Sequence, residues 1–190
     1  ISRFDNGAIQ LDGTNSTVTS KTASADIKLT TMAIMGSRSL DNGMSVGLGM
    51  RNGQLGSGTV STLAGVTYSV ESATASSAIA SIAYEKPEIA LRAELVYEDS
   101  VGMPFDVTLS NGVTATGSLS LPQSTTLNFQ TGIATDTLLF GSVRNVAWSS
   151  GQVAVDAAVD LLDISSEFDN TTSYNIGVGR KLTEDLSASL

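Results

Sequence analysis

Four short polar connectors recur along the chain at nearly constant spacing, each between runs of alternating apolar and polar residues. Marked by Gly43, Glu88, Asp136 and Asp185, they lie 45, 48 and 49 residues apart. The Asn-Gly pair of the first connector is typical of a hairpin turn, because the central positions of such a turn need φ > 0 or a local side-chain bond. The spacing is too long for a compact β-sandwich, in which turns recur about every 8–12 residues. It leaves room for two membrane-crossing strands of about 9–11 residues and one longer loop.

The connectors and the alternation together predict the strands. We expect strands at 27–40, 44–54, 73–85, 88–99, 118–134, 137–149 and 172–182, and an eighth that begins at Leu186. Residues 1–20 are expected to form a loop or an incomplete leading segment. The predicted fold class is all-β, an antiparallel transmembrane β-barrel of the outer-membrane type. An open barrel edge leaves backbone groups unpaired in hydrocarbon, so residues 1–190 are expected to be a single partial barrel domain, a fragment of about seven to eight strands of a larger barrel.

The alternation is clearest in residues 88–99. One face is apolar and the other is charged: Ile89, Leu91 and Leu95 alternate with Arg92, Glu94 and Glu98. Because successive side chains of a strand point to opposite faces, this pattern indicates a lipid-facing side and a wet side.

The orientation of residues 137–149 depends on their one charge. Arg144 belongs on the wet side, and by alternation Leu138 and Phe140 then point to the same side. The predicted interior is therefore partly apolar. That suits an apolar ligand better than the purely polar lumen of a small porin.

Two missing residue types and the charge balance exclude several functions. The chain has no Cys and no His, which removes disulfides, thiol nucleophiles, imidazole acid–base groups and the usual zinc ligands. Its net charge of -9 repels the phosphates of nucleic acids. We therefore expect neither an enzyme nor a nucleic-acid-binding protein, and no metal or cofactor.

Several strings in the second half of the chain resemble one protein family. They are YEKPEIALR at 84–92, LPQS at 121–124, LNFQTGIA at 127–134, DTLLFGSVR at 136–144, WS at 148–149 and GVGRKLTE at 177–184. In this order they resemble the middle of the FadL family of outer-membrane transporters of long-chain fatty acids. The resemblance covers Tyr84 to Leu190, over half of the chain.

The resemblance implies a monomeric barrel of fourteen strands in the outer membrane of a Gram-negative bacterium, plugged by an N-terminal hatch. It implies uptake of long-chain fatty acids or other hydrophobic small molecules by diffusion, with outer-membrane lipids around the barrel and no cofactor. No hatch segment with its Asn-Pro-Ala signature precedes the predicted strands, so we expect a chain without the hatch.

Six residues are candidates for lining the interior. They carry polar or aromatic side chains on the predicted wet faces: Arg92, Glu94, Asn128, Gln130, Phe140 and Arg144. Arg92 could meet a ligand carboxylate through a bidentate contact. An ion pair that solvates the wall is the more ordinary interpretation of Arg92 and Glu94.

The segment after residue 149 has the one helical period in the sequence. Its acidic stripe is Asp156, Asp160 and Asp163, and its adjoining apolar stripe is Val155, Val159 and Leu162. This pattern predicts a short loop helix with a solvated acidic face. The alternative is that the apolar stripe lines an external groove that first receives a lipophilic ligand.

An alternative from another class stays open, namely a secreted or surface β-rich structural or adhesive protein without transport activity. A sandwich of that kind would bury Ile89, Leu91 and Leu95 against a second sheet. A barrel would expose them as part of an outer apolar band. The orientation of these three side chains therefore separates the two interpretations.

Overall fold

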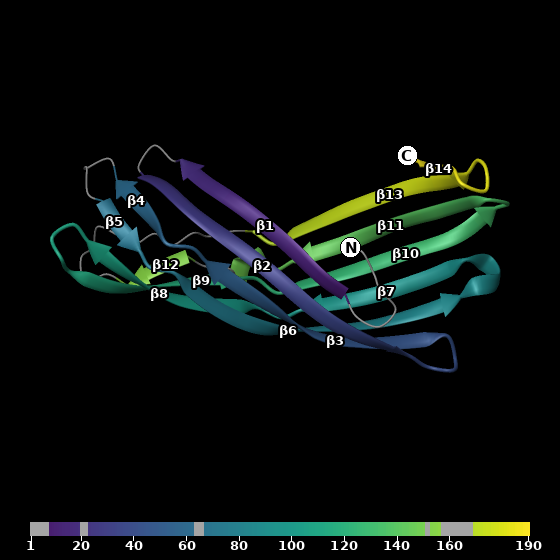
Figure 1. The fold of residues 1–190 in the computed structure, drawn as a ribbon, viewed down its shortest axis with the longest axis horizontal. Coiled ribbons are helices and arrows are strands. Elements are labelled where there is room, and N and C mark those ends of the chain that lie inside the picture. Colours follow the sequence, from purple (N-terminus) through teal and green to yellow (C-terminus); the bar gives the residue numbers. More distant parts are fainter. Residues whose placement is uncertain (1–7, 20–22, 63–66, 151–152, 157–168) are drawn as a thin grey trace.

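The computed structural model describes residues 8–19, 23–62, 67–150, 153–156 and 169–190 of the chain. Within these ranges, antiparallel strands form one sheet, as the sequence predicts, but the sheet has fourteen strands where seven to eight are expected (Figure 1). The strands are β1 (Ala8–Thr19), β2 (Ala23–Ser39), β3 (Met44–Leu55), β4 (Gly58–Thr62), β5 (Thr67–Val70), β6 (Ala73–Lys86), β7 (Leu91–Glu98), β8 (Val101–Leu109), β9 (Thr114–Leu121), β10 (Ser124–Ala134), β11 (Thr137–Val146), β12 (Val153–Asp156), β13 (Thr171–Lys181) and β14 (Ser187–Ser189). Two 3₁₀ turns are η1 (Pro87–Ile89) and η2 (Trp148–Ser150).

Short turns gather at one end of the sheet, the right-hand end in Figure 1. In the turn after β2, the Leu40 N–H donates to the Met44 carbonyl at 2.7 Å and the Met44 N–H donates to the Asn42 side chain at 3.2 Å. Gly43 has a φ of 78°, which glycine adopts without steric cost. The predicted Asn-Gly hairpin turn is therefore confirmed.

Most of the predicted strands are confirmed, with small differences at their ends. The strand predicted at 118–134 is wrong, because Pro122 and Gln123 separate β9 from β10 there. The segment 1–20, expected to be a loop or an incomplete leading segment, contains β1, which pairs with β2 along its whole length.

Several strands are the two halves of one longer, bent strand. The pairing register shows this most simply for β3–β4 and β5–β6. Leu55 pairs with Ala73, and three residues further along each strand Gly58 pairs with Val70. The bend therefore uses the same number of residues on both partners. The hairpins β4–β5 and β8–β9 make up the end of the sheet opposite the short turns (Figure 1).

An apolar core lies at this loop end. There β8 packs over one face of the sheet, the face that carries Arg51 and Gly53 of β3. We call the sheet the wall and this face its inner face. The buried residues of the core are Leu55, Tyr68, Val70, Val101, Met103, Phe105 and Val107; we call this cluster the apolar cap. Met103 is 0% exposed, and a Cβ on Gly53 would lie 3.2 Å from its sulfur. The glycine therefore leaves the space that lets β8 approach β3. Burial of each such large side chain stabilises the fold by about 1.5–3 kcal/mol.

The strand β7 pairs with β6, but its continuation β8 does not, because β8 packs inward. Ile79 pairs with Glu98, and Val70 pairs with Val107. The register is the same at both points, but β6 and β8 form no ladder pairs in the interval between them. Pro104, which has no N–H to donate, lies in this interval.

At each bend, the inward-facing positions switch between even and odd residue numbers. On β7 the inward positions are even-numbered and end at Glu98, whereas on β8 the buried positions are odd-numbered and begin at Val101. Their ladder partners Ser124 and Leu121 change in the same way. A period of two therefore cannot be followed through a bend, which is why the sequence pattern misplaces the strand at 118–134.

The outer face of the wall is covered by exposed apolar side chains. They include Ile34, Leu48, Met50, Ile82, Leu127, Tyr174 and Ile176. Ile89 and Leu95 are 48% and 44% exposed, and Leu91 is half-buried. The outer apolar band is thus confirmed, and the interpretation of these residues as the buried face of a sandwich is wrong.

The predicted loop helix does not form where the structure describes it. Residues 153–156 form β12, which pairs with β9 and sets Val155 opposite Gly117. Pairing with a neighbouring strand outweighs the helical period there. The rest of the predicted helix, including Asp160 and Asp163, lies outside the described residues.

In the parts of the chain that the structure describes, no helix is long and apolar enough to cross a membrane.

Candidate functional site

Five of the six residues predicted to line the interior stand in two neighbouring rows across β7, β10 and β11. Arg92 lies opposite Gln130, which in turn lies opposite Phe140. In the next row towards the loops, Glu94 lies opposite Asn128. Directly opposite residues of a ladder share one face, so the structure brings these five together on the inner face.

Arg92 lies between two carboxylates, and we call these three residues the turn-side cluster. Its Nη1 pairs with Glu85 Oε1, and its Nη2 lies 3.4 Å from Glu94 Oε2. The ladder explains the contact, because Glu85 stands opposite Arg92 on β6 and Glu94 is two residues along β7. The ordinary interpretation of Arg92, an ion pair on the wall, is what the structure shows.

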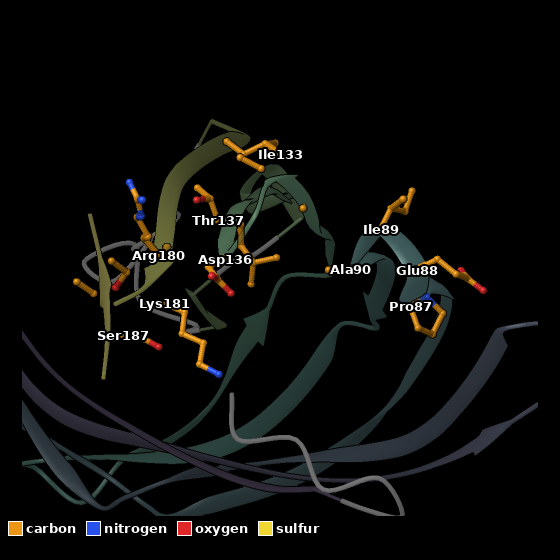
Figure 2. A pocket seen from close by; sticks show the side chains of 16 residues that line it. Pro87, Glu88, Ile89, Ala90, Ile133, Asp136, Thr137, Arg180, Lys181 and Ser187 are labelled. Atoms are coloured by element: carbon orange, nitrogen blue, oxygen red, sulfur yellow. The ribbon is translucent and has the colours of Figure 1, made fainter. Parts of the chain in front are cut away.

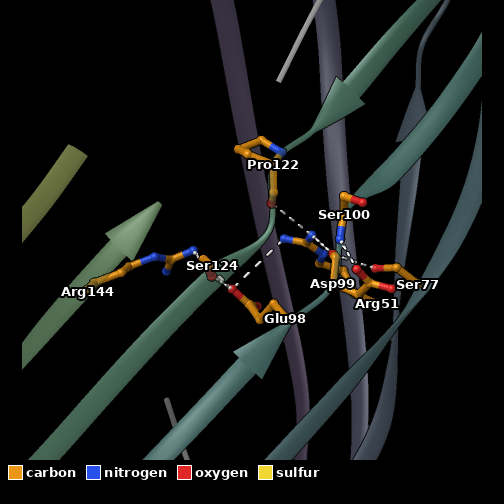
Figure 3. A network of polar contacts seen from close by, with 8 residues as sticks. All are labelled: Arg51, Ser77, Glu98, Asp99, Ser100, Pro122, Ser124 and Arg144. Atoms are coloured by element: carbon orange, nitrogen blue, oxygen red, sulfur yellow. Dashed lines mark hydrogen bonds and ion pairs between the residues drawn. The ribbon is translucent and has the colours of Figure 1, made fainter. Parts of the chain in front are cut away.

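Glu98 lies between two guanidinium groups, as Figure 3 shows, and we call Arg51, Glu98 and Arg144 the loop-side cluster. The Arg144 Nη2 donates to Glu98 Oε2 at 3.0 Å, and the Arg51 Nη1 lies 3.9 Å from the same oxygen. The Ser124 hydroxyl donates to it at 2.5 Å. The Arg144 side chain is 49% exposed, whereas that of Arg51 is 10% exposed. Arg144 therefore joins the other five predicted residues on the inner face; their role as ligand-lining groups stays a prediction.

Arg51 also ties together the two bends of the β7–β10 pair. Its Nη2 donates to the Asp99 carbonyl at 2.5 Å and to the Pro122 carbonyl at 3.4 Å. The Ser77 hydroxyl donates to the same Asp99 carbonyl at 3.0 Å. Within the described part of the chain, the Nε of Arg51 is buried without a hydrogen-bond partner.

The sequence indicates Arg51 only weakly as a site residue. Its signal is a lone charge on a predicted wet face otherwise made of small residues, Ser45, Gly47 and Gly49. The carbonyls that it binds belong to residues 48 and 71 positions away along the chain. No local pattern could have supplied those partners.

A hollow of about 490 Å³ lies beside Asn128 and Phe140. The Asn175 amide at its edge donates to the Ser142 hydroxyl at 2.8 Å. The Phe140 ring lies over Gly177, where a Cβ would come within 2.7 Å of the ring. The inner face here offers one aromatic surface framed by amide and hydroxyl groups.

A larger hollow of about 780 Å³ opens at the short-turn end (Figure 2). One inner row of its lining consists of Gly132, Leu138 and Gly179, and the glycines leave the space free. Figure 2 shows Lys181 and Ile133 pointing to opposite sides of the wall. Leu138 lies on the side that the sequence predicts. The hollow itself could not be predicted, because it depends on how several turns meet.

The external groove predicted from Val155, Val159 and Leu162 stays a prediction. Val155 lies on a strand, and the other two residues lie outside the described part of the chain. Among the residues that are described, no group of three or more metal-ligating side chains occurs. The described inner face thus offers ion pairs, amides, hydroxyls and one aromatic ring for contact with a molecule.

Two solved structures resemble this one. The toluene transporter TbuX of Ralstonia pickettii matches with a TM-score of 0.67 and 11% sequence identity, over 96% of this chain and 63% of that chain. The CymD monoaromatic hydrocarbon channel matches with a TM-score of 0.62 and 12% identity, over 98% of this chain and 64% of that chain. The chain therefore spans just under two thirds of the length of these proteins. No family model matches the sequence, and no curated protein matches it.

At such low identity the likeness bears on the fold alone. Both neighbours are hydrophobic-compound transporters of the FadL type, which agrees with the resemblance seen in the sequence. The sheet of this chain does not close into a barrel over the described residues. Over the described residues the chain has an open antiparallel β-sheet whose fold is similar to that of these two outer-membrane β-barrel transporters.

Proposed function

We propose that this chain forms part of the wall of an outer-membrane barrel in a Gram-negative bacterium, and that hydrophobic small molecules pass along its inner face by diffusion. The observation that carries the proposal is the contrast between the two faces of one sheet. The outer face is apolar and exposed, whereas the inner face carries ion pairs, amides and a phenyl ring. The intact protein would be a monomer surrounded by outer-membrane lipids.

The outer face supports the membrane part of the proposal. Leu48, Met50 and Ile176 each expose more than half of their surface, and they belong to an apolar band that continues across neighbouring strands. Proteins that are monomeric in water rarely expose apolar patches larger than a few hundred Å². Lipid chains would cover this band without any cost of hydrating it.

The inner face supports the passage of an apolar molecule. Phe140 and Leu138 lie on it beside the two hollows, so a molecule without polar groups finds apolar contact between the polar rows. We propose that Arg92, Glu94, Asn128, Gln130, Phe140 and Arg144 line this route. None of them is proposed to react with the molecule, and the proposal includes no enzymatic step.

Two classes of cargo are candidates. The resemblance in the sequence favours long-chain fatty acids, whereas the names of the two similar structures refer to toluene and to monoaromatic hydrocarbons. The two classes differ in a property that the inner face can discriminate, because a fatty acid carries a carboxylate at neutral pH.

The test is the entry of radiolabelled toluene into a Gram-negative host that produces the chain in its outer membrane. We expect faster entry than in the same host without the chain. Asn128→Trp places an indole on the inner face and should slow entry, while Leu127→Trp, one residue away on the outer face, should leave it unchanged.

Equal entry with and without the chain, although cell fractionation finds it in the outer membrane, would contradict the proposal. Equal slowing by both tryptophan variants would contradict the inner-face route. Resistance of the folded chain to SDS at room temperature serves as the folding control for both variants.

A further inference from the structure

All the arginines on the described inner face of the wall have carboxylate partners. Arg51 and Arg144 contact Glu98, and Arg92 contacts both Glu85 and Glu94. Three guanidinium groups thus meet three carboxylates on this face, in the turn-side and loop-side clusters.

We propose that this pairing makes the passage selective for neutral apolar molecules over carboxylates with a similar hydrocarbon skeleton, and that Glu98 is the residue that sets the selectivity. The inference rests on the proposed function, whose cargo it narrows.

The physical reason is competition for the same donors. A carboxylate that leaves water must find hydrogen-bond donors to replace its hydration, because burying an unpaired charge is costly. Arg144 is the exposed guanidinium of the loop-side cluster, but its Nη2 already donates to Glu98 at 3.0 Å. A second carboxylate at that site would lie beside the first and be repelled by it. A neutral molecule such as toluene needs no such donors and loses nothing there.

The two clusters differ in their ratio of glutamates to arginines, and this difference allows the effect of Glu98 to be tested separately. One glutamate serves two arginines in the loop-side cluster, whereas two glutamates serve one arginine in the turn-side cluster. Neutralising Glu98 therefore deprives Arg51 and Arg144 of the carboxylate that they share. Neutralising Glu85, which is not one of the six residues proposed to line the route, leaves Arg92 paired with Glu94.

The matched variants are thus Glu98→Gln and Glu85→Gln. Each raises the net charge of -9 by one, so the long-range repulsion of anions by the whole protein changes equally in both. A difference between the two variants reports the local pairing alone.

Another cation, Lys181, lies at the short-turn end, where its side chain is exposed. Water and salt screen an ammonium in that position. On β13 it lies eight residues beyond Ser173, the ladder partner of Arg144, so it does not replace Arg144 as a partner for a carboxylate that reaches the loop-side cluster.

The experiment measures entry of toluene and of benzoate, at equal concentration, into the host that carries the full chain in its outer membrane. For the unaltered chain we expect toluene to enter at least about tenfold faster than benzoate, each corrected for the host without the chain. In Glu98→Gln, benzoate entry should rise about tenfold, because the freed Arg144 fork can form a charge-assisted hydrogen bond with it. Toluene entry should stay within about twofold, and Glu85→Gln should leave the rates of both compounds near those of the unaltered chain.

Glu98→Gln leaves Arg51 buried without its carboxylate and so could fail to fold. The double variant Arg51→Met with Glu98→Gln removes the buried cation together with its partner and keeps Arg144 free. It should show the same gain in benzoate entry, and this gain should shrink as salt is raised.

The outcomes separate the two proposals. Equal entry of toluene and benzoate through the unaltered chain overturns the selectivity and leaves the proposed function standing. A folded Glu98→Gln or double variant without a gain in benzoate entry also overturns the role of Glu98. If neither compound enters faster than in the host without the chain, the proposed function itself fails, and the selectivity fails with it.

Discussion

The apolar cap and the loop-side cluster are neighbouring regions built on the same long strands, yet they are held together by opposite means. Beyond the bends, β8 contributes Met103, which is completely buried among apolar side chains. Before the bends, β7 contributes Glu98, which is held by two guanidinium groups and a hydroxyl. The cap is stabilised by the burial of apolar surface, which has no preferred direction. The cluster is stabilised by hydrogen bonds and ion pairs, which need particular distances and directions. The comparison predicts that the cap is sensitive to charge and the cluster to the loss of a single partner.

The largest effect is expected from Met103→Asp. A carboxylate at a position without solvent exposure has no partner among apolar neighbours, so the free energy of unfolding should fall by about 4 kcal/mol or more. Urea unfolding in detergent micelles, followed by the fluorescence of Trp148, measures it. Gly102→Asp is the control, because Gly102 is the adjacent outward position and a Cβ there meets nothing within 4 Å. Equal loss in both variants would show that the cap is not a buried core.

The second effect is expected from Arg51→Ala. It removes one partner of a largely buried ion pair and two hydrogen bonds to the bends, and it should reduce the unfolding free energy by about 3 kcal/mol. Arg144→Ala removes the exposed partner of the same carboxylate and should cost about 1 kcal/mol or less. The same urea titration compares the two. If Arg144→Ala lowers the unfolding free energy as much as Arg51→Ala does, then burial does not determine how much each arginine of the loop-side cluster stabilises the fold.

A smaller effect in the cap is expected from Gly117→Ala. The new Cβ would overlap the ring of Phe105, which stands opposite on β8, and the strain should cost about 1–3 kcal/mol. Phe105→Leu in the same chain removes the ring and should recover part of the loss, a coupling that a double-mutant cycle detects. Strictly additive effects of the two substitutions would contradict the ring contact.

The smallest effect is expected on the outer face, which belongs to neither region. The Tyr97 hydroxyl donates to the Gln123 side chain at 3.1 Å, so Tyr97→Phe should cost no more than about 1 kcal/mol. Tyr174→Phe, at a tyrosine that is 75% exposed, is the reference and should cost less. Thermal unfolding in the same detergent can rank the two. A larger loss at Tyr174 would sink this assignment.

The sequence predicts the wall of the sheet well, because the wall follows a period of two between recognisable turns. The inward orientation of Phe140 and Arg144 could be derived from one charge and the alternation on β11. The ladder then confirms that Arg92, Gln130 and Phe140 share a face. Local periodicity and turn chemistry are sufficient for such assignments.

The cap could not be predicted in the same way, although part of its signal is present. Val101, Met103, Phe105 and Val107 alternate with exposed residues, and Asn111-Gly112 is hairpin chemistry, with Gly112 at a φ of 81°. A strand pair could have been predicted there. That it folds over the inside of the wall could not, since this depends on contacts with Gly53 and Leu55, which are far away along the chain.

The constant number of residues in each bend has a consequence for how this chain can vary. Two residues separate Glu98 from Val101, and two separate Leu121 from Ser124. Arg51 binds the backbone carbonyls of Asp99 and Pro122, so it places little demand on the identity of their side chains. An inserted or deleted residue would instead turn the later side chains of the strand to the opposite face, sending the cap residues outward and Asp106 into the core. The bends should therefore accept many substitutions and very few changes of length.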